Sequence, residues 1–256
     1  MALIAAYATP AGPRYGLLVD GIVHVWDGHP LTDHPGAPGR ALGPLDELSL
    51  LPPLMPGKLV CVGRNYAAHA AEHQAAVPDE PMLFLKPPSA VIAHGAPIEL
   101  PANVGRVDHE AELAVIIGRR ARRVRREDAL DYVLGYTCAN DVSARDYQRK
   151  DGQWGRAKGF DTFCPLGPVL ATDLDPARLA VRARVNGETR QNGSTADMVF
   201  DVPFLIAFVS AVMTLEPGDV ILTGTPEGVS PIAPGDVVEI EVEGIGALRN
   251  PVVAQG

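Results

Sequence analysis

Polar and apolar residues alternate along short segments of this chain, and turns rich in Pro and Gly separate the segments. The segment RYGLLVDGIVHVW, residues 14–26, alternates on both sides of Asp20-Gly21. An Asp-Gly pair favours a type I′ turn, because both central residues of that turn need a positive φ. The pattern therefore predicts a β-hairpin. The Pro-rich stretch LLPPLMPGK, residues 50–58, then closes a small N-terminal domain, which we place at residues 1–55, ahead of a larger domain at 56–256.

Short β-type runs between Pro and Gly turns dominate the larger domain. The runs are KLVCV (58–62), MLFLK (82–86), ELAVIIG (112–118), DVILTG (219–224) and DVVEIEVEG (236–244). Two segments favour helices instead: REDALDYV, residues 126–133, has acids in its first turn, and residues 202–215 follow Asp201 and end at EPGD. Neither recurs at a fixed period, so no repeat architecture is indicated. These elements predict a mainly β fold with a few helices, of the α+β class.

Length and charge narrow the range of functions. A chain of 256 residues with 46% apolar residues can form one large domain, or a domain with a small appendage, around a substantial core. The formal net charge of −9 has the wrong sign for a binder of phosphate backbones or anionic membranes, so nucleic acid is not an expected partner. The apolar run at 202–215 is too short to cross a bilayer, and we expect a core helix and no membrane association.

The three cysteines, Cys61, Cys138 and Cys164, form no C-x-x-C pair. They therefore indicate neither a disulfide framework nor a thiolate zinc site, and we expect buried thiols in a reducing compartment. The first residues lack the positive region and sustained apolar core of a secretory signal, so a cytoplasmic location is the expectation. Six arginines lie within residues 119–126, between a predicted strand and a predicted helix, and such a run is typical of a solvated connection.

Two closely spaced acids, Glu110 and Glu112, precede a run that is apolar at every position from Leu113 to Ile117. Alternate residues of a strand share one face, so both carboxylates are predicted to point the same way. Glu239, Glu241 and Glu243 have the same spacing, but they alternate with apolar residues, which is typical of a half-exposed strand. The continuous apolar run after Glu112 instead predicts a strand that is covered on both faces.

Buried carboxylates need a cation, a proton or a metal ion, because burying an unpaired ion costs several kcal/mol. Oxygen ligands favour Mg²⁺, Mn²⁺ or Ca²⁺ over zinc. A third acid, Asp141, ends the strand-like VLGYTCAN (133–140), and a βαβ-like excursion through the predicted helix would bring it beside the glutamates. The alternative is a Lys or Arg partner, and a basic side chain lying between the acids in place of an ion would overturn the prediction of a metal site.

The segment VGRNYAAHAAEH, residues 62–73, contains a second candidate constellation. If the chain is helical after Tyr66, His69 and Glu72 lie three residues apart on one face, where the carboxylate can orient and polarise the imidazole. Such a pair can act as a general base. The alternative is a surface helix with incidental polar residues.

Seven segments together resemble landmarks of the fumarylacetoacetate hydrolase family, in the order found in that family, and cover nearly everything from Lys58 to the C-terminus. They are VGRNYAAHAAE, HEAELAVIIG, GYTCANDVSARDYQ, AKGFDTFCPLGP, NGETRQNGSTADM, LEPGDVILTGTPEGV and GIGALRN. The resemblance implies a β-rich core with a rolled mixed sheet, a small N-terminal domain and a homodimer.

The resemblance also implies roles for individual residues. Glu110, Glu112 and Asp141 match ligands of a divalent metal, normally Mg²⁺ or Mn²⁺. The segment RNYAAHAAEH matches a lid that orders over bound substrate and carries a His-Glu dyad, here His69 and Glu72. The positions that resemble substrate-contacting groups are Arg64, Gln148, Lys158 and Thr225. Arg145 we assign to structural support.

The family's substrates are 2-oxo or 1,3-dicarbonyl acids and diacids, which react through an enolate that a metal stabilises. Relocation of a proton gives isomerisation, attack by water gives C–C bond hydrolysis, and loss of CO₂ gives decarboxylation. The chain is most similar to bacterial 2-hydroxyhepta-2,4-diene-1,7-dioate isomerases of aromatic catabolism. An acylpyruvate-type hydrolase and an oxaloacetate-type decarboxylase are the alternatives within the family. A non-catalytic protein with a structural Ca²⁺ is the alternative outside it.

Overall fold

The structure is a computed structural model that describes residues 1–72 and 74–256. Most of its regular elements are strands, as predicted. The strands are β1 Leu3–Thr9, β2 Gly12–Val19, β3 Ile22–Trp26, β4 Ala41–Pro44, β5 Leu50–Leu51, β6 Leu59–Gly63, β7 Met82–Lys86, β8 Val91–Ile92, β9 Ile98–Leu100, β10 Val107–Asp108, β11 Ala111–Ile117, β12 Val133–Asn140, β13 Ser143–Ala144, β14 Cys164–Ala171, β15 Ala180–Val185, β16 Glu188–Ser194, β17 Val220–Leu222, β18 Val237–Val242 and β19 Gly246–Ala254. The α-helices are α1 Ala67–Glu72, α2 Arg145–Asp151, α3 Gly155–Lys158 and α4 Val202–Val212, and the 3₁₀ helices are η1 Leu45–Glu47, η2 Pro88–Ala90, η3 Arg126–Tyr132, η4 Pro176–Arg178 and η5 Thr195–Asp197.

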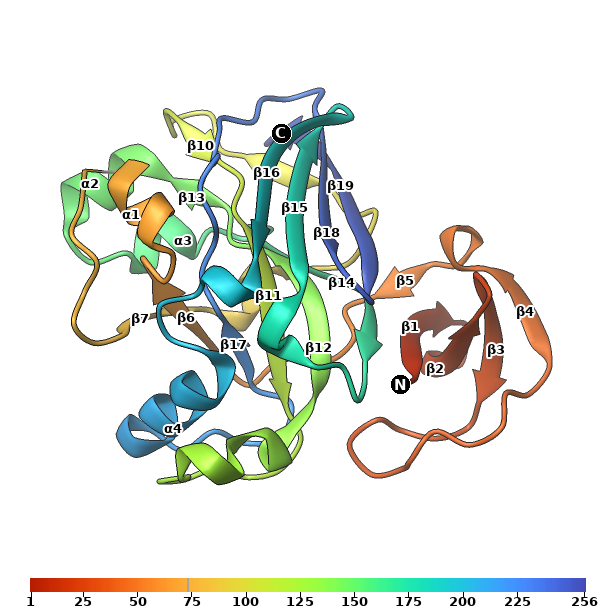
Figure 1. Ribbon diagram of the computed structural model, residues 1–256. Coiled ribbons are helices and arrows are strands. Elements are labelled where there is room, and N and C mark those ends of the chain that lie inside the picture. Colours follow the sequence, from red (N-terminus) through yellow and green to blue (C-terminus); the bar gives the residue numbers. More distant parts are fainter. Residues whose placement is uncertain (73) are drawn as a thin grey trace.

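The N-terminal strands form an antiparallel lobe, drawn in red and orange in Figure 1. The predicted hairpin is present: β2 pairs with β3, and Asp20 and Gly21 have φ values of 48° and 79°. The lobe is continuous with the rest of the molecule, because β1 also pairs with β14, with Leu3 opposite Ala171. One mixed sheet therefore runs from the N-terminal lobe into the body of the protein.

That sheet has the order β4-β3-β2-β1-β14-β12-β11-β17-β6-β7. Every residue of β11 is buried, as the continuous apolar run predicted. The helix predicted after β11 is present, but as a 3₁₀ helix, and the βαβ-like direction predicted for this excursion was wrong. Residues 126–132 form a 3₁₀ helix, and the connection reverses the chain, so that β12 pairs antiparallel with β11 and Glu112 lies opposite Ala139.

A second sheet, of order β16-β15-β18-β19-β9, packs against the first. The core between them contains Leu113 and Val115 of β11 together with Val181 and Ile240 of the second sheet. The glutamates of β18 lie on its other face, where Glu239 and Glu241 form ion pairs with Arg184. The alternating pattern of residues 236–244 therefore predicted a half-exposed strand correctly.

The predicted C-terminal helix is α4, and Asp201 caps it by accepting a 2.9 Å hydrogen bond from Phe204 N–H. It ends at Val212, three residues earlier than the pattern suggested. Within residues 1–72 and 74–256, no helix is long and apolar enough to cross a bilayer. The six arginines of residues 119–126 are all exposed, as expected of a solvated connection.

Candidate active site

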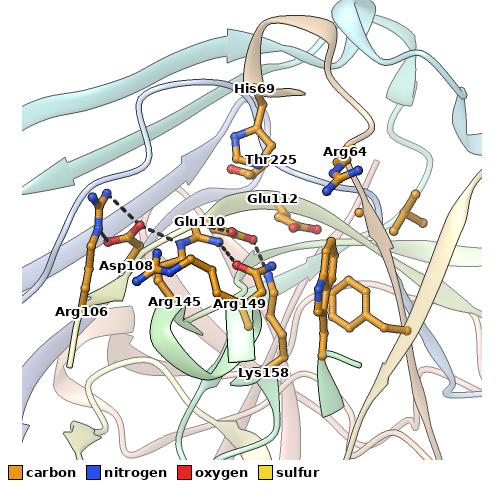
Figure 2. A pocket seen from close by; sticks show the side chains of 15 residues that line it. Arg64, His69, Arg106, Asp108, Glu110, Glu112, Arg145, Arg149, Lys158 and Thr225 are labelled. Atoms are coloured by element: carbon orange, nitrogen blue, oxygen red, sulfur yellow. Dashed lines mark hydrogen bonds and ion pairs between the residues drawn. The ribbon is translucent and has the colours of Figure 1, made fainter. Parts of the chain in front are cut away.

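A cavity of about 350 Å³ opens where β6, β7, β10 and β11 approach α1, α2 and α3. Charged side chains dominate its wall, and Figure 2 shows them from close by. The lining residues are Val62, Gly63, Arg64, His69, Phe84, Arg106, Asp108, Glu110, Glu112, Arg145, Gln148, Arg149, Trp154, Lys158 and Thr225. All sequence-predicted site residues line this cavity except Glu72 and Asp141, each of which contacts a residue that does.

The structure brings the three predicted metal ligands together. Carboxylate oxygens of Glu110, Glu112 and Asp141 lie within 4.8 Å of one another, and all three residues are buried. The antiparallel pairing of β11 with β12 causes this convergence, because Asp141 directly follows β12 and its backbone N–H donates to Glu110 O at 3.0 Å. Glu110 and Glu112, which are close in the sequence, thus meet Asp141, which lies about thirty positions further along the chain.

Two of these acids, Glu110 and Asp141, have Lys or Arg partners, which is the alternative to a metal site that the sequence left open. Lys158 Nζ lies between Glu110 Oε2, at 2.7 Å, and Asp141 Oδ2, at 2.6 Å. Lys86 Nζ contacts Asp141 Oδ1 at 2.6 Å, and Arg145 Nη2 contacts Glu110 Oε1 at 2.7 Å. Burial would raise the pKa of Glu110, but Lys158 and Arg145 outweigh burial and lower it well below the ordinary value. Glu110 is therefore ionised.

Glu112 differs from its neighbours. Gly224 N–H donates to Glu112 Oε2 at 2.7 Å, but in the described part of the chain no basic side chain forms an ion pair with this carboxylate. Burial, together with the charges of Asp141 and Glu110, raises its pKa well above the ordinary value. A buried carboxylate beside two others, with no cation of its own, is a donor set that fits a hard divalent cation.

Lys158 is held in place by aromatic rings as well as by acids. Its Nζ lies 5.1 Å from the centroid of the Phe84 ring and 5.9 Å from that of Trp154. Burial would lower the pKa of Lys158, but Asp141 and Glu110 outweigh burial and raise it above the ordinary value. The ammonium group is therefore charged and fixed in the cavity wall.

The predicted helix after Tyr66 is α1, and it places His69 and Glu72 on one face. His69 Nδ1 lies 3.4 Å from Glu72 Oε2. Both carboxylate oxygens of Glu72 also accept from Gly228 N–H, at 3.2 and 3.3 Å, which ties α1 to the loop after Thr225. In Figure 2 His69 lies with Thr225 on one side of the acids, and Lys158 lies on the other.

Arg64 and Gln148 are held by specific contacts at the cavity wall. Arg64 has a left-handed backbone with φ of 56°, and the next residue, Asn65, fixes this turn by bonding to Phe200 and Thr223. Gln148 Oε1 accepts from Arg145 Nη1 at 2.9 Å, so its amide N–H groups are the donors that remain for a ligand.

Two family models match the chain. The model described as Fumarylacetoacetate (FAA) hydrolase C-terminal matches residues 58–253, and the model described as Rv2993c-like, N-terminal matches residues 4–53. This chain belongs to the fumarylacetoacetate hydrolase family. The resemblance inferred from the sequence is thereby confirmed, and membership in this family of enzymes supports an enzymatic activity.

Three similar proteins illustrate the range of this family. Protein Rv2993c of Mycobacterium tuberculosis is 52% identical over 233 residues, which cover 88% of each chain. The mitochondrial oxaloacetate tautomerase FAHD1 of Arabidopsis thaliana is 48% identical over 201 residues, or 76% of this chain and 90% of that protein. The crystal structure of 2-hydroxyhepta-2,4-diene-1,7-dioate isomerase from Mycobacterium marinum superposes with a TM-score of 0.91 at 46% identity, and the match covers all of both chains.

Sequence reasoning missed several members of this fumarylacetoacetate hydrolase site. Asp108 is fully buried and bonds to Arg106 and Arg145. It extends the alternation of Glu110 and Glu112 by one step toward the N-terminus, and that signal was available. Lys86 carried a weaker signal, as a lone cation at the end of the apolar run 82–86. Nothing local indicated that it would bond to an acid 55 residues away.

Proposed function

We propose that this protein is a divalent-metal-dependent isomerase that relocates a proton within a 2-oxo dicarboxylic acid, of the 2-hydroxyhepta-2,4-diene-1,7-dioate or oxaloacetate type. One observation carries the proposal: three converging buried carboxylates, a His-Glu pair and a charged lysine meet at a single cavity, and Glu110, Glu112, His69 and Lys158 line its wall. The carboxylates suit a metal, the imidazole suits proton transfer, and the cations suit an anionic substrate.

The charges around the cavity support a cation at Glu112. The cluster contains four buried acids, namely Asp108, Glu110, Glu112 and Asp141, and four basic partners, namely Lys86, Arg106, Arg145 and Lys158. The bases contact three of the acids and leave Glu112 without one. Lys158 does lie between two acids, but each carboxylate oxygen has two lone pairs and keeps acceptor capacity for another cation.

The same count favours a substrate with two negative charges. These four acids and four bases are balanced in number and Arg64 also lines the cavity, so a bound divalent cation would leave the site with an excess of positive charge. Buried charge that is not neutralised is unfavourable by several kcal/mol. A dicarboxylate would compensate more of this positive charge than a monocarboxylate would. We therefore infer a dicarboxylic substrate.

Glu110, Glu112 and Asp141 would hold the metal, which supplies Lewis-acid stabilisation of the negative charge that develops on an enolate oxygen. Lys158 adds a fixed positive charge beside that oxygen, where an oriented charge needs no reorganisation during the reaction. Arg64 and the amide N–H groups of Gln148 bind carboxylate oxygens from the wall of the cavity. Arg145 keeps Gln148 and Glu110 in position.

His69 moves the proton. Glu72 orients the imidazole through Nδ1 and stabilises its protonated form, so the ring can take a proton from one carbon and return it to another. Because α1 and the loop at Gly228 are joined through Glu72, the imidazole keeps a fixed relation to this side of the cavity. Hydrolysis is the second candidate, because the same pair could activate a water molecule for attack on a carbonyl carbon.

The names of two similar proteins support proton relocation. The similar proteins from Mycobacterium marinum and Arabidopsis thaliana are named an isomerase and a tautomerase, and both activities move a proton between carbon and an oxygen or a second carbon. At 46% and 48% identity, these names favour the same class of step here. The homodimer and the division into residues 1–55 and 56–256 remain proposals, which sedimentation and limited proteolysis would test.

The test is an assay of purified protein with Mg²⁺ against 2-hydroxyhepta-2,4-diene-1,7-dioate, enol oxaloacetate and an acylpyruvate. Ultraviolet absorbance follows loss of the conjugated or enol form, and a CO₂ assay detects decarboxylation. We expect isomerisation or tautomerisation that EDTA abolishes and Mg²⁺ or Mn²⁺ restores. Cleavage of the acylpyruvate without proton relocation would favour hydrolysis. Tight Ca²⁺ binding with no reaction on any compound would refute the enzymatic proposal.

A further inference from the structure

Gln191 of β16 is fully buried beside the cavity but does not line it. Its side-chain oxygen accepts from Ala111 N–H at 2.9 Å. Its amide nitrogen donates to Pro226 O at 2.7 Å and to Thr225 Oγ1 at 2.8 Å. One side chain thus connects β11, which carries Glu112, to the loop that carries Thr225.

The direction of these hydrogen bonds is fixed by chemistry. A backbone N–H can only donate and a backbone carbonyl oxygen can only accept, so the contacts with Ala111 and Pro226 identify which end of the amide is which. The end nearest Thr225 is therefore the N–H₂ group. Thr225 Oγ1 accepts a hydrogen bond from it, and the hydroxyl proton of Thr225 must point in another direction.

His109 independently fixes the same orientation of the Gln191 side-chain amide. It is fully buried, with Nδ1 3.1 Å from Gln191 Oε1 and Nε2 2.8 Å from Ser230 Oγ. Because Gln191 Oε1 has no hydrogen to give, His109 Nδ1 is the donor in that contact. Three fixed donors and acceptors therefore surround Gln191, and rotation of its amide would leave several buried groups unsatisfied.

We propose that Gln191 is a positioning residue that makes Thr225 a hydrogen-bond donor to an anionic oxygen of the ligand. Thr225 lines the cavity, and within residues 1–72 and 74–256 no acceptor receives its hydroxyl proton. The preceding residue, Gly224, donates to Glu112, so the donor stands beside the acidic cluster. The nature of that ligand, a 2-oxo acid, rests on the proposed function.

This polarity determines which ligand groups are accepted next to Thr225. A carboxylate or oxo oxygen can receive the proton, whereas an ammonium or other donor group would face a hydrogen already pointing toward it. A hydrogen bond to a charged acceptor contributes enough to change affinity about tenfold to hundredfold. Gln191 would therefore influence specificity without touching the ligand.

The test is a double-mutant cycle on binding of oxalate, which has the paired oxygens of a 2-oxo acid and undergoes no proton relocation. Titration calorimetry with Mg²⁺ measures the dissociation constant for the wild type, Gln191→Met, Thr225→Val and the double variant. We expect Thr225→Val to weaken oxalate binding about tenfold or more and Thr225→Ser to restore it. Gln191→Met should weaken binding at least about threefold with Thr225 present, but by less than about twofold in the Thr225→Val background.

Two further variants control for loss of stability and for loss of the Gln191 side-chain shape. Thr223→Val removes a buried hydroxyl that donates to Leu113 O and does not line the cavity, so it should lower stability and leave the oxalate affinity unchanged. Gln191→Glu keeps the shape and the oxygen near Ala111 but turns the donor into an acceptor. Gln191→Glu should weaken oxalate binding more when Thr225 is present than in the Thr225→Val background. This comparison replaces the one with Gln191→Met if that variant does not fold.

Equal effects of the Gln191 variants with and without the Thr225 hydroxyl would overturn the inference and leave Gln191 a purely structural link. Failure of oxalate to bind the wild type would overturn it as well. The proposed function fails separately: a protein that shows the coupling but transforms no 2-oxo dicarboxylate would refute the function alone. Turnover without the coupling would refute the inference alone.

Discussion

Replacing Glu112 with Gln is expected to stabilise the metal-free protein and to remove its response to metal. Glu112 is buried and has no basic partner in the described chain, and its pKa lies well above the ordinary value of 4.5. A carboxyl group whose pKa is raised by folding binds its proton more tightly in the folded state. The free energy of unfolding therefore falls as the pH rises above 4.5, by about 1.4 kcal/mol per pH unit until the folded-state pKa is passed.

The size of the effect is limited by the working pH. At pH 7 the loss reaches at most about 3.5 kcal/mol, since that pH is roughly 2.5 units above the ordinary pKa. Gln keeps the acceptor for Gly224 N–H and has no charge to bury. For a chain of this length, about 1 kcal/mol corresponds to about 2–4 °C in Tm, so Glu112→Gln should melt up to roughly 10 °C higher in EDTA at pH 7. The gain should shrink toward pH 5.

Saturating Mg²⁺ should reverse the order of the two proteins. Metal at about 1,000 times its Kd stabilises the wild type by about 4.1 kcal/mol, which exceeds its largest expected deficit at pH 7, and Glu112→Gln should show no such gain. Glu110→Gln is the matched control, because Glu110 has Lys158 and Arg145 as partners. It should lower Tm in EDTA, since a buried pair that loses one partner costs about 3–5 kcal/mol. A lower Tm for Glu112→Gln in EDTA, or a Tm gain from Mg²⁺ equal to that of the wild type, would refute the reasoning.

Three further changes separate chemistry, the acidic cluster and the scaffold. His69→Ala should keep the Mg²⁺-dependent rise in Tm but lower kcat for proton relocation about 10²- to 10⁴-fold in the absorbance assay; unchanged turnover would contradict the dyad. Lys86→Met should lower the free energy of unfolding by about 3–5 kcal/mol in urea titrations, because it leaves Asp141 with fewer cations, and a loss below about 1 kcal/mol would count against that view. Asp201→Ala removes the α4 cap and should lower Tm by about 2–4 °C with kcat unchanged; an altered kcat would show that α4 reaches the site.

Local sequence patterns were sufficient to predict several strands, including the one that carries Glu112. Alternation around Asp20-Gly21 predicted the hairpin, and the continuous apolar run after Glu112 predicted a strand buried on both faces; both are present. These features are local, because side-chain direction in a strand follows from residue spacing alone. The spacing of His69 and Glu72 likewise placed the two residues on one face of a short helix.

Features that depend on contacts between distant segments could not be predicted from local residue spacing. The direction of β12 relative to β11 depends on how residues 118–132 reverse the chain, and the parallel arrangement was the wrong choice. Lys86 and Gln191 are both defined by partners far away in the sequence, Asp141 and Thr225 respectively. The identity of a partner is a property of the folded sheet, whereas apolar spacing shows only that some partner is needed.

Because β1 pairs with β14, the N-terminal lobe covers an edge of the main sheet. Leu3 and Ile4 lie opposite Ala171 and Leu170, so the first strand covers backbone groups that would otherwise form an unpaired border of the main sheet. Uncovered borders of this kind recruit strands from other molecules. A chain shortened by its first 55 residues would expose unpaired backbone N–H and C=O groups of β14, the strand that begins at Cys164. Self-association through this edge is the expected consequence.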